Sequence, residues 1–213
     1  MTMLPEPAIL AAFILASVIL IITPGPDMTL FLGQTINGGR AQGFASMFGA
    51  TAGLLVHSML AAFGLSALLV ASATAFTVIK VAGAGYLLWL AVQAIRHGSS
   101  LSLKPGRLSH LSLRRAFAIG LGVNLLNPKI VMFFLTFLPQ FVSASDPDAP
   151  ARLLMLGLLY ALLTPPLCTP MILGAERFAA AMRASPRMMR AFDWTFAGLM
   201  GAFAVRLLFA RAN

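Results

Sequence analysis

The chain has 213 residues, of which 59% are hydrophobic and only 10% are charged, whereas a soluble domain carries about a quarter charged residues. The mean hydropathy of +0.89 comes from apolar blocks of roughly 20 residues, the length that crosses a bilayer as a helix. This composition excludes a soluble globular domain. A net charge of +9 would suggest nucleic acid in a soluble protein, but most basic residues here lie in loops beside apolar segments, so no nucleic-acid partner is expected.

Six apolar segments predict an all-α membrane protein with six transmembrane helices, and residues 1–213 are expected to form a single transmembrane domain. The predicted spans are 8–34, 43–70, 74–95, 115–142, 151–174 and 192–210. The first block carries Glu6 and lacks the basic start and cleavage site of a signal peptide, so we expect it to be retained as a span. The single cysteine, Cys168, excludes an internal disulfide and a multi-thiolate metal site. We expect no metal and no cofactor.

Loop charges predict the orientation in the membrane. Basic residues fall between spans one and two, three and four, and five and six: Arg40, Arg96, Lys104, Arg107, Arg114, Arg115, Arg177, Arg183, Arg187 and Arg190. The other side carries Glu6, Asp146 and Asp148, and only Arg152 and Arg211 go against the bias. By the positive-inside rule, the basic loops are cytoplasmic and both termini face outward.

The first span is interrupted near its middle. The interruption consists of Thr23, Pro24, Gly25, Pro26 and Asp27. Because proline lacks an amide hydrogen and clashes with the preceding turn, a regular helix cannot continue here. We predict a half-helix that ends near Ile22 and a second that starts at Thr23, with Thr23 as the N-cap and Pro24 in the first turn. A carboxylate at mid-membrane costs about 2.5–3.5 kcal/mol, so Asp27 is expected to face the bundle interior or a wet cavity.

The fourth span repeats this arrangement with the opposite charge. Asn127 is a natural N-cap, Pro128 suits the first helical position, and Lys129 follows in the first turn. Asn124 lies three residues before Asn127, on the same helical face. A helix start beside a lysine favours an anion. One interruption thus offers a carboxylate and the other an ammonium, which are complementary to the two charges of a free amino acid.

Two alternatives assign no substrate to these residues. The prolines could shape helix packing only, or Asp27 and Lys129 could form a permanent structural ion pair. If Asp27 does act in transport, it could bind a substrate ammonium or carry a coupling proton. His57 could relay protons or be a packing residue, and the small residues from Gly49 to Gly53 favour close helix approach and would also allow a homodimer.

The order of the spans predicts two sets of three helices, each opened by an interrupted span. Three spans per set force opposite orientations on the two sets, so we predict an inverted repeat, and matching interruptions in such a repeat point to the binding site of a secondary transporter. In the fifth span, Pro165, Pro166 and Pro170 are expected to break the helix as well.

Several segments resemble a known family: "TPGPDMTLFLGQTINGGRAQGFASMFGATAGLLVH", "IKVAGAGYLLWLAVQAIR", "AFAIGLGVNLLNPKIVMFFLTFLPQFV" and "GLMGAFAVRLLFA". In this order and spacing they look like the LysE/RhtB family of bacterial amino-acid exporters. The resemblance implies a six-span inner-membrane carrier that expels amino acids or close derivatives, driven by the proton-motive force. The signature segments of the family fall on Thr23–Asp27 and on residues 127–129.

The sequence thus favours a secondary efflux carrier for a small zwitterion, and the family resemblance implies a proton as the coupling ion. The alternatives are a non-transporting assembly or sensory subunit and, more remotely, an intramembrane enzyme. An enzyme would need a catalytic set such as paired aspartates, whereas Asp27 is the one acidic residue placed deep in a predicted span.

Overall fold

The computed structural model describes residues 6–65, 73–97, 111–142 and 146–209, and all regular structure in these ranges is helical. The predicted turn near residue 70, most of the long basic loop before span four, and Arg211 lie outside the described residues.

The first interrupted span consists of α1 (Pro7–Ile22) and α2 (Pro26–Gly38), which meet at a bend of 49°. α3 (Arg40–Met59) follows at once and runs into the π-helical segment η1 (Leu60–Leu65). Gly39 makes the tight turn between α2 and α3 with a φ of 86°, a backbone conformation that favours glycine. This turn reverses the chain directly after the interrupted span.

The second interrupted span begins after α5 (Ala73–His97). α6 (Leu113–Leu125) starts at Ser112, whose hydroxyl accepts a hydrogen bond from the Arg115 amide. After the interruption come α7 (Pro128–Met132), the π-helical segment η2 (Phe133–Phe137) and the 3₁₀ segment η3 (Leu138–Phe141). The bend between the two halves is again 49°, so both predicted interruptions exist and deflect the chain equally.

The expected break in span five is wrong, because α8 (Ala149–Leu173) is one continuous helix through Pro165, Pro166 and Pro170. Proline already has a helical φ, and packing in a membrane bundle can hold a helix together where backbone bonds are missing. α8 packs against both α1 and α3. The chain then turns through the short helix α9 (Ala175–Ala184) into α10 (Pro186–Phe209).

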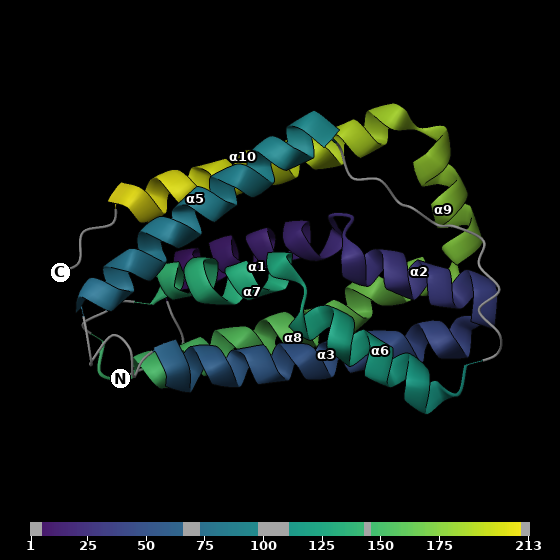
Figure 1. Ribbon diagram of the computed structural model, residues 1–213, viewed down its shortest axis with the longest axis horizontal. Helices are drawn as coiled ribbons and strands as arrows, with labels where there is room; N and C mark the ends of the chain where they lie inside the picture. Colours follow the sequence, from purple (N-terminus) through teal and green to yellow (C-terminus); the bar gives the residue numbers. More distant parts are fainter. Residues whose placement is uncertain (1–5, 66–72, 98–110, 143–145, 210–213) are drawn as a thin grey trace.

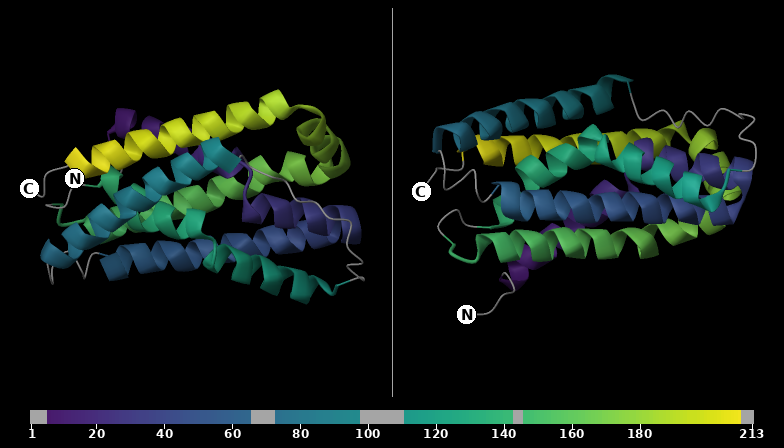
Figure 2. Two further views of the ribbon diagram at one scale, coloured as in Figure 1. Left: turned by 45° about the horizontal axis from the view of Figure 1, so that its top comes forward. Right: turned by 60° about the horizontal axis from the view of Figure 1, so that its bottom comes forward.

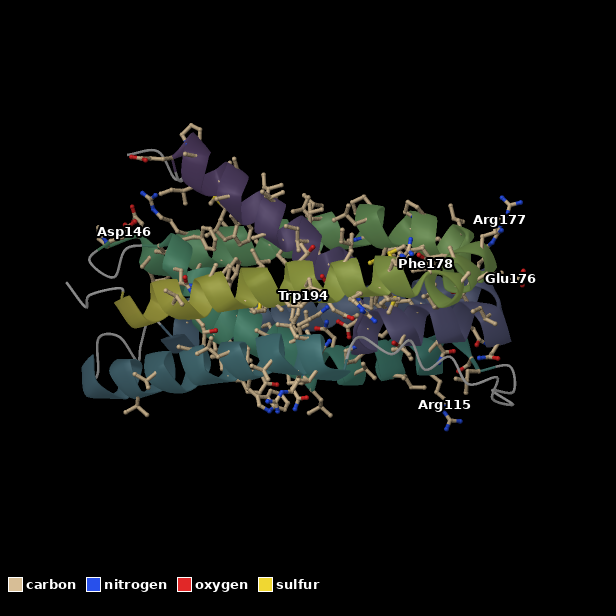
Figure 3. All side chains as sticks on the ribbon, turned by 90° about the horizontal axis from the view of Figure 1, so that it is seen from above. Arg115, Asp146, Glu176, Arg177, Phe178 and Trp194 are labelled. Carbon is tan, nitrogen blue, oxygen red and sulfur yellow. The ribbon has the colours of Figure 1, made fainter. Side chains whose placement is uncertain are left out.

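The long helices run side by side along the molecule (Figure 1). α1 starts and α10 ends at the left of Figure 1, whereas α9 lies across the opposite end. α5 packs along α10, and α3 lies against both α6 and α8 (Figure 2). Figure 3 places Arg115 and Arg177 at the end where α9 lies and Asp146 at the other. Arg115 and Arg177 thus share the end where α9 lies with Glu176, and Asp146 at the other end pairs with Arg152. We call the end where α9 lies the basic end.

Within the described residues, α3 with η1 and α8 are long and apolar enough to cross a membrane. Each bent pair, α1 with α2 and α6 with the segments after it, adds a further candidate span, which gives up to four. This finding shows a helical protein suited to a membrane, while the six spans and the inverted repeat stay predictions.

α3 and α6 pack closely enough for their backbones to touch. A Cβ atom built at Gly49 would collide with the backbone of Phe117, and one built at Gly120 would collide with the backbone of Ser46. The prediction that the small residues of α3 allow close helix approach is confirmed. A buried aromatic cluster joins η2 to α8, and the ring centroids of Phe133 and Tyr160 lie 4.3 Å apart in it.

Candidate functional site

The break between α1 and α2 falls where the sequence predicts, but its details differ. α1 ends at Ile22 as expected, whereas the N-cap of α2 is Gly25 and its first residue is Pro26, each two positions later than predicted. Thr23 is therefore not an N-cap. Its hydroxyl donates back to the Ile19 carbonyl at 2.6 Å and closes the end of α1 instead. Asp27 lies in the first turn of α2, as predicted.

The Pro-Gly-Pro sequence leaves backbone carbonyls of α1 without their helical donors. In a continuous helix the amide of residue 24 would donate to Leu20, but proline has no N–H. Lys129 takes its place: its Nζ donates to the Leu20 carbonyl at 3.2 Å and to the Thr23 carbonyl at 3.0 Å. The ammonium also lies at a helix C-terminus, where positive charge is favoured. A side chain of the second interrupted span thus supplies the hydrogen-bond donors that are missing at the break in the first.

The break between α6 and α7 follows the prediction closely. Asn127 is the N-cap of α7, and its side-chain oxygen accepts from the Lys129 amide at 3.0 Å. Pro128 occupies the start of the helix. This cap aims the Lys129 side chain from the start of α7 towards the end of α1.

A second contact crosses the two breaks in the other direction. Asn124, near the end of α6, donates from Nδ2 to Oδ2 of Asp27 on α2 at 2.8 Å. The carbonyl of Asn124 in turn lies 3.4 Å from Nε2 of His57, whose ring stacks on Phe134 with centroids 5.4 Å apart. The structure therefore joins His57 to the site as well as packing it, and both roles considered for it stay open.

Three buried polar atoms at the breaks make no hydrogen bond of ordinary geometry among the described residues, although the Asn127 side chain interacts with the Asp27 carboxylate. The three atoms are Oδ1 of Asp27, Oδ1 of Asn124 and Nδ2 of Asn127. Buried polar atoms are almost always paired, so such a group of two acceptors and one donor fits a site that binds a polar ligand. The acceptors suit an ammonium, and the donor suits a carboxylate.

A cavity of about 30 Å³ lies beside Asp27 and Asn124. It is also bounded by Met28 on α2, Lys129 on the second interrupted span, and Thr164 and Cys168 on α8. It is large enough for one or two water molecules and far smaller than the roughly 300 Å³ of a small-molecule site. This conformation is closed around the site.

Asp27 and Lys129 both line this cavity without forming an ion pair. A permanent Asp27–Lys129 bridge is therefore absent from this conformation. Each charge is held instead by neutral groups of the opposite interrupted span, Asp27 by the Asn124 amide and Lys129 by the α1 carbonyls. The Asn127 side chain also interacts with the Asp27 carboxylate, whose Oδ1 makes no hydrogen bond of ordinary geometry.

Sequence reasoning missed the residues that leave room for these contacts. A Cβ atom on Gly25 would lie 3.1 Å from Nζ of Lys129, and one on Gly53 of α3 would lie 2.5 Å from Oδ1 of Asn124. It also missed Tyr160 and Thr164, which line the cavity from α8. The glycine in TPGPD and the small residues of α3 were visible signals, but neither indicates which side chain would occupy the space.

Polar groups buried at two interrupted helices of a membrane bundle define the class of protein as a membrane transport protein. The sequence bears this out. Residues 18–211 match the family described as LysE type translocator, and the chain belongs to that family. It is a transporter and not an enzyme.

Relatives with named activities are efflux proteins. The chain is 32% identical over 201 residues to a homoserine/homoserine lactone efflux protein of Salmonella typhimurium, which covers 94% of this chain and 96% of that protein. It is 28% identical over 205 residues to a threonine efflux protein of Salmonella typhimurium, with 91% and 94% covered. An uncharacterized membrane protein of Vibrio cholerae is 32% identical over 149 residues, with 69% and 71% covered. No solved structure matches the chain.

Proposed function

We propose that this protein is a secondary carrier that exports an amino acid or a close derivative across the bacterial inner membrane, coupled to the proton-motive force. The substrate would bind where the two interrupted spans cross, with its ammonium at Asp27 and Asn124 and its carboxylate at the Asn127 amide. The observation that carries this proposal is the cavity at the breaks, which Asp27, Asn124 and Lys129 line with a carboxylate, an amide and an ammonium.

The chemistry of these atoms supports a zwitterion. A charge-assisted hydrogen bond to a carboxylate is about twice as strong as a neutral one, so an ammonium is preferred over a neutral amide as a partner of the Asp27 carboxylate. The names of the relatives indicate the substrates to test first, homoserine and threonine. Both carry a hydroxyl, and Thr164 and Tyr160 line the same cavity.

The proposal includes an orientation and an architecture. Basic residues gather at the end where α9 lies and Asp146 lies at the other (Figure 3), so we place the basic end in the cytoplasm with both termini outward. The equal bends of 49° in the two interrupted spans support six spans arranged as two inverted sets of three.

Efflux from proteoliposomes tests the site. We would preload a panel of amino acids that includes homoserine and threonine, impose a pH gradient, and compare wild type with Asp27→Asn. Asp148→Asn is the matched control, because this aspartate is exposed and far from the breaks in sequence. We expect the control to transport normally and Asp27→Asn to lose transport while remaining folded. Normal transport by Asp27→Asn would remove Asp27 from the mechanism.

The same preparation tests the coupling. If protons drive export, a protonophore abolishes uphill transport of the substrate without preventing its downhill exchange. Uphill transport that survives the protonophore would exclude proton coupling. A preparation that moves no member of the panel would point instead to the non-transporting alternative.

A further inference from the structure

A second cavity lies in line with the site cavity, between the same two helices. Its volume is about 410 Å³, and it is bounded by Thr35 and Ile36 near the end of α2, by Ile172 near the end of α8, and by the starts of α3 and α9. The site cavity meets α2 at Met28 and α8 at Cys168. At 1.5 Å per residue, the two cavities are separated by roughly 10 Å along α2 and roughly 6 Å along α8.

The wall between the cavities is apolar. Met28 and Leu32 of α2, Met171 of α8, and Ala175 and Phe178 of α9 form a hydrophobic cluster distinct from the main core, which we call the apolar plug. Met28 also lines the site cavity and Ala175 also lines the larger one. The plug therefore fills the interval from one cavity to the other.

The plug is built from side chains that can move apart. Methionine is flexible and repacks readily. Phe178 is half-buried and comes from α9, a helix of 10 residues that lies across the basic end of the bundle (Figures 1 and 3). α9 is held between Gly174 and Ser185, which flank it at the ends of α8 and α10. A small rotation of α9 would withdraw Phe178 and Ala175 from α2.

The larger cavity is lined by charges of both signs. Arg40 comes from the start of α3, and Glu176 and Arg177 come from the start of α9. Guanidinium groups attract a carboxylate and a carboxylate attracts an ammonium, so this lining suits a small zwitterion more than a solute with one sign of charge.

We infer that the larger cavity is the vestibule through which a zwitterionic substrate reaches the site from the basic end, and that the apolar plug is its closed gate. This inference rests on the proposed function and extends it, because it names the access route and the residues that control it. Opening the plug would connect the vestibule to Asp27 along α2 and α8.

The only cysteine of the chain offers a direct test. Cys168 is 4% exposed, lines the site cavity and lies one turn from Met171 of the plug. We would measure its rate of labelling by a charged, membrane-impermeant thiol reagent in inverted vesicles, where the reagent meets the basic end under the proposed orientation, and in right-side-out vesicles.

In inverted vesicles we expect Phe178→Ala and Leu32→Ala to raise the Cys168 labelling rate about tenfold or more, because truncating either side chain leaves a gap in the plug. Phe48→Ala is the matched control, since Phe48 is 52% exposed on α3 and lies outside the plug. Cys168→Ser supplies the unlabelled background.

An increase from the vestibule side alone supports the gate. An unchanged rate in both folded plug variants overturns it, and so does an equal increase from both sides of the membrane. Labelling requires no substrate, so a gate confirmed in this way would stand even if no amino acid on the panel were exported. Conversely, export with an unresponsive Cys168 would reject the gate and keep the carrier.

Discussion

The Lys129 side chain offers the sharpest test of how the interrupted spans hold together. Its ammonium donates to the carbonyls of Leu20 and Thr23, two residues that are 2% and 3% exposed. Lys129→Met keeps an unbranched side chain, one atom shorter than lysine, and removes the charge and both hydrogen bonds. An unpaired buried polar group costs about 1–3 kcal/mol, whereas interhelical hydrogen bonds in membranes average about 0.6 kcal/mol. We therefore expect the free energy of unfolding to fall by about 1–4 kcal/mol.

A double-mutant cycle with Pro24→Ala assigns this loss to the break. Alanine at position 24 has an N–H that can donate to Leu20, so it should recover about 1 kcal/mol in the Lys129→Met background. Titration with sodium dodecyl sulfate in mixed micelles, followed by circular dichroism, measures each variant. Arg115→Met is the control, because Arg115 is an exposed cation. Equal stability of wild type and Lys129→Met, or strict additivity in the cycle, would refute the proposed role of Lys129 at the break.

Three further predictions concern the surroundings of the site. Gly53→Ala should push Asn124 away from the site and lower the efflux rate. Gly122→Ala is the control, because the space around its Cβ position is open, and it should leave the efflux rate unchanged. Equal effects of the two substitutions would disprove the steric argument. Gly120→Ala should destabilise the protein by about 1–3 kcal/mol in the same unfolding titration, because it forces α3 and α6 apart. Asn127→Ala should cost about 0.5–2 kcal/mol through loss of the cap on α7. Asn127→Ser should retain the cap while losing the amide donor, so normal export by Asn127→Ser would argue against a carboxylate contact at this position.

Local chemistry made the two interruptions predictable. Proline removes a backbone donor wherever it stands, so the breaks at Pro24 and Pro128 follow from neighbouring residues alone. The same holds for Asn127, whose capping hydrogen bond spans only two residues. The start of α2 was misplaced because the sequence offers two prolines, and the hydroxyl of Thr23 is satisfied within α1 instead of capping α2.

Contacts between distant segments could not be predicted in this way. The sequence indicates that Lys129 is buried and charged, but nothing near it specifies the α1 carbonyls as its partners. The continuity of α8 has the same origin, because three prolines predict a break unless neighbouring helices hold the segment straight. The vestibule and the apolar plug depend on the relative position of α2, α8 and α9, which local patterns do not define.

The contact between Lys129 and Leu20 has a consequence for how the protein is made. The two residues are 109 positions apart, and at about 5–20 residues per second a ribosome needs about 5–20 s to synthesise that length. The first span is therefore synthesised before Lys129, and its Leu20 carbonyl lacks this hydrogen-bond donor until the second interrupted span emerges. During that interval the nascent chain must be sheltered by the insertion machinery or by its own later helices. The break in the first span can therefore be completed only after the second interrupted span has been synthesised.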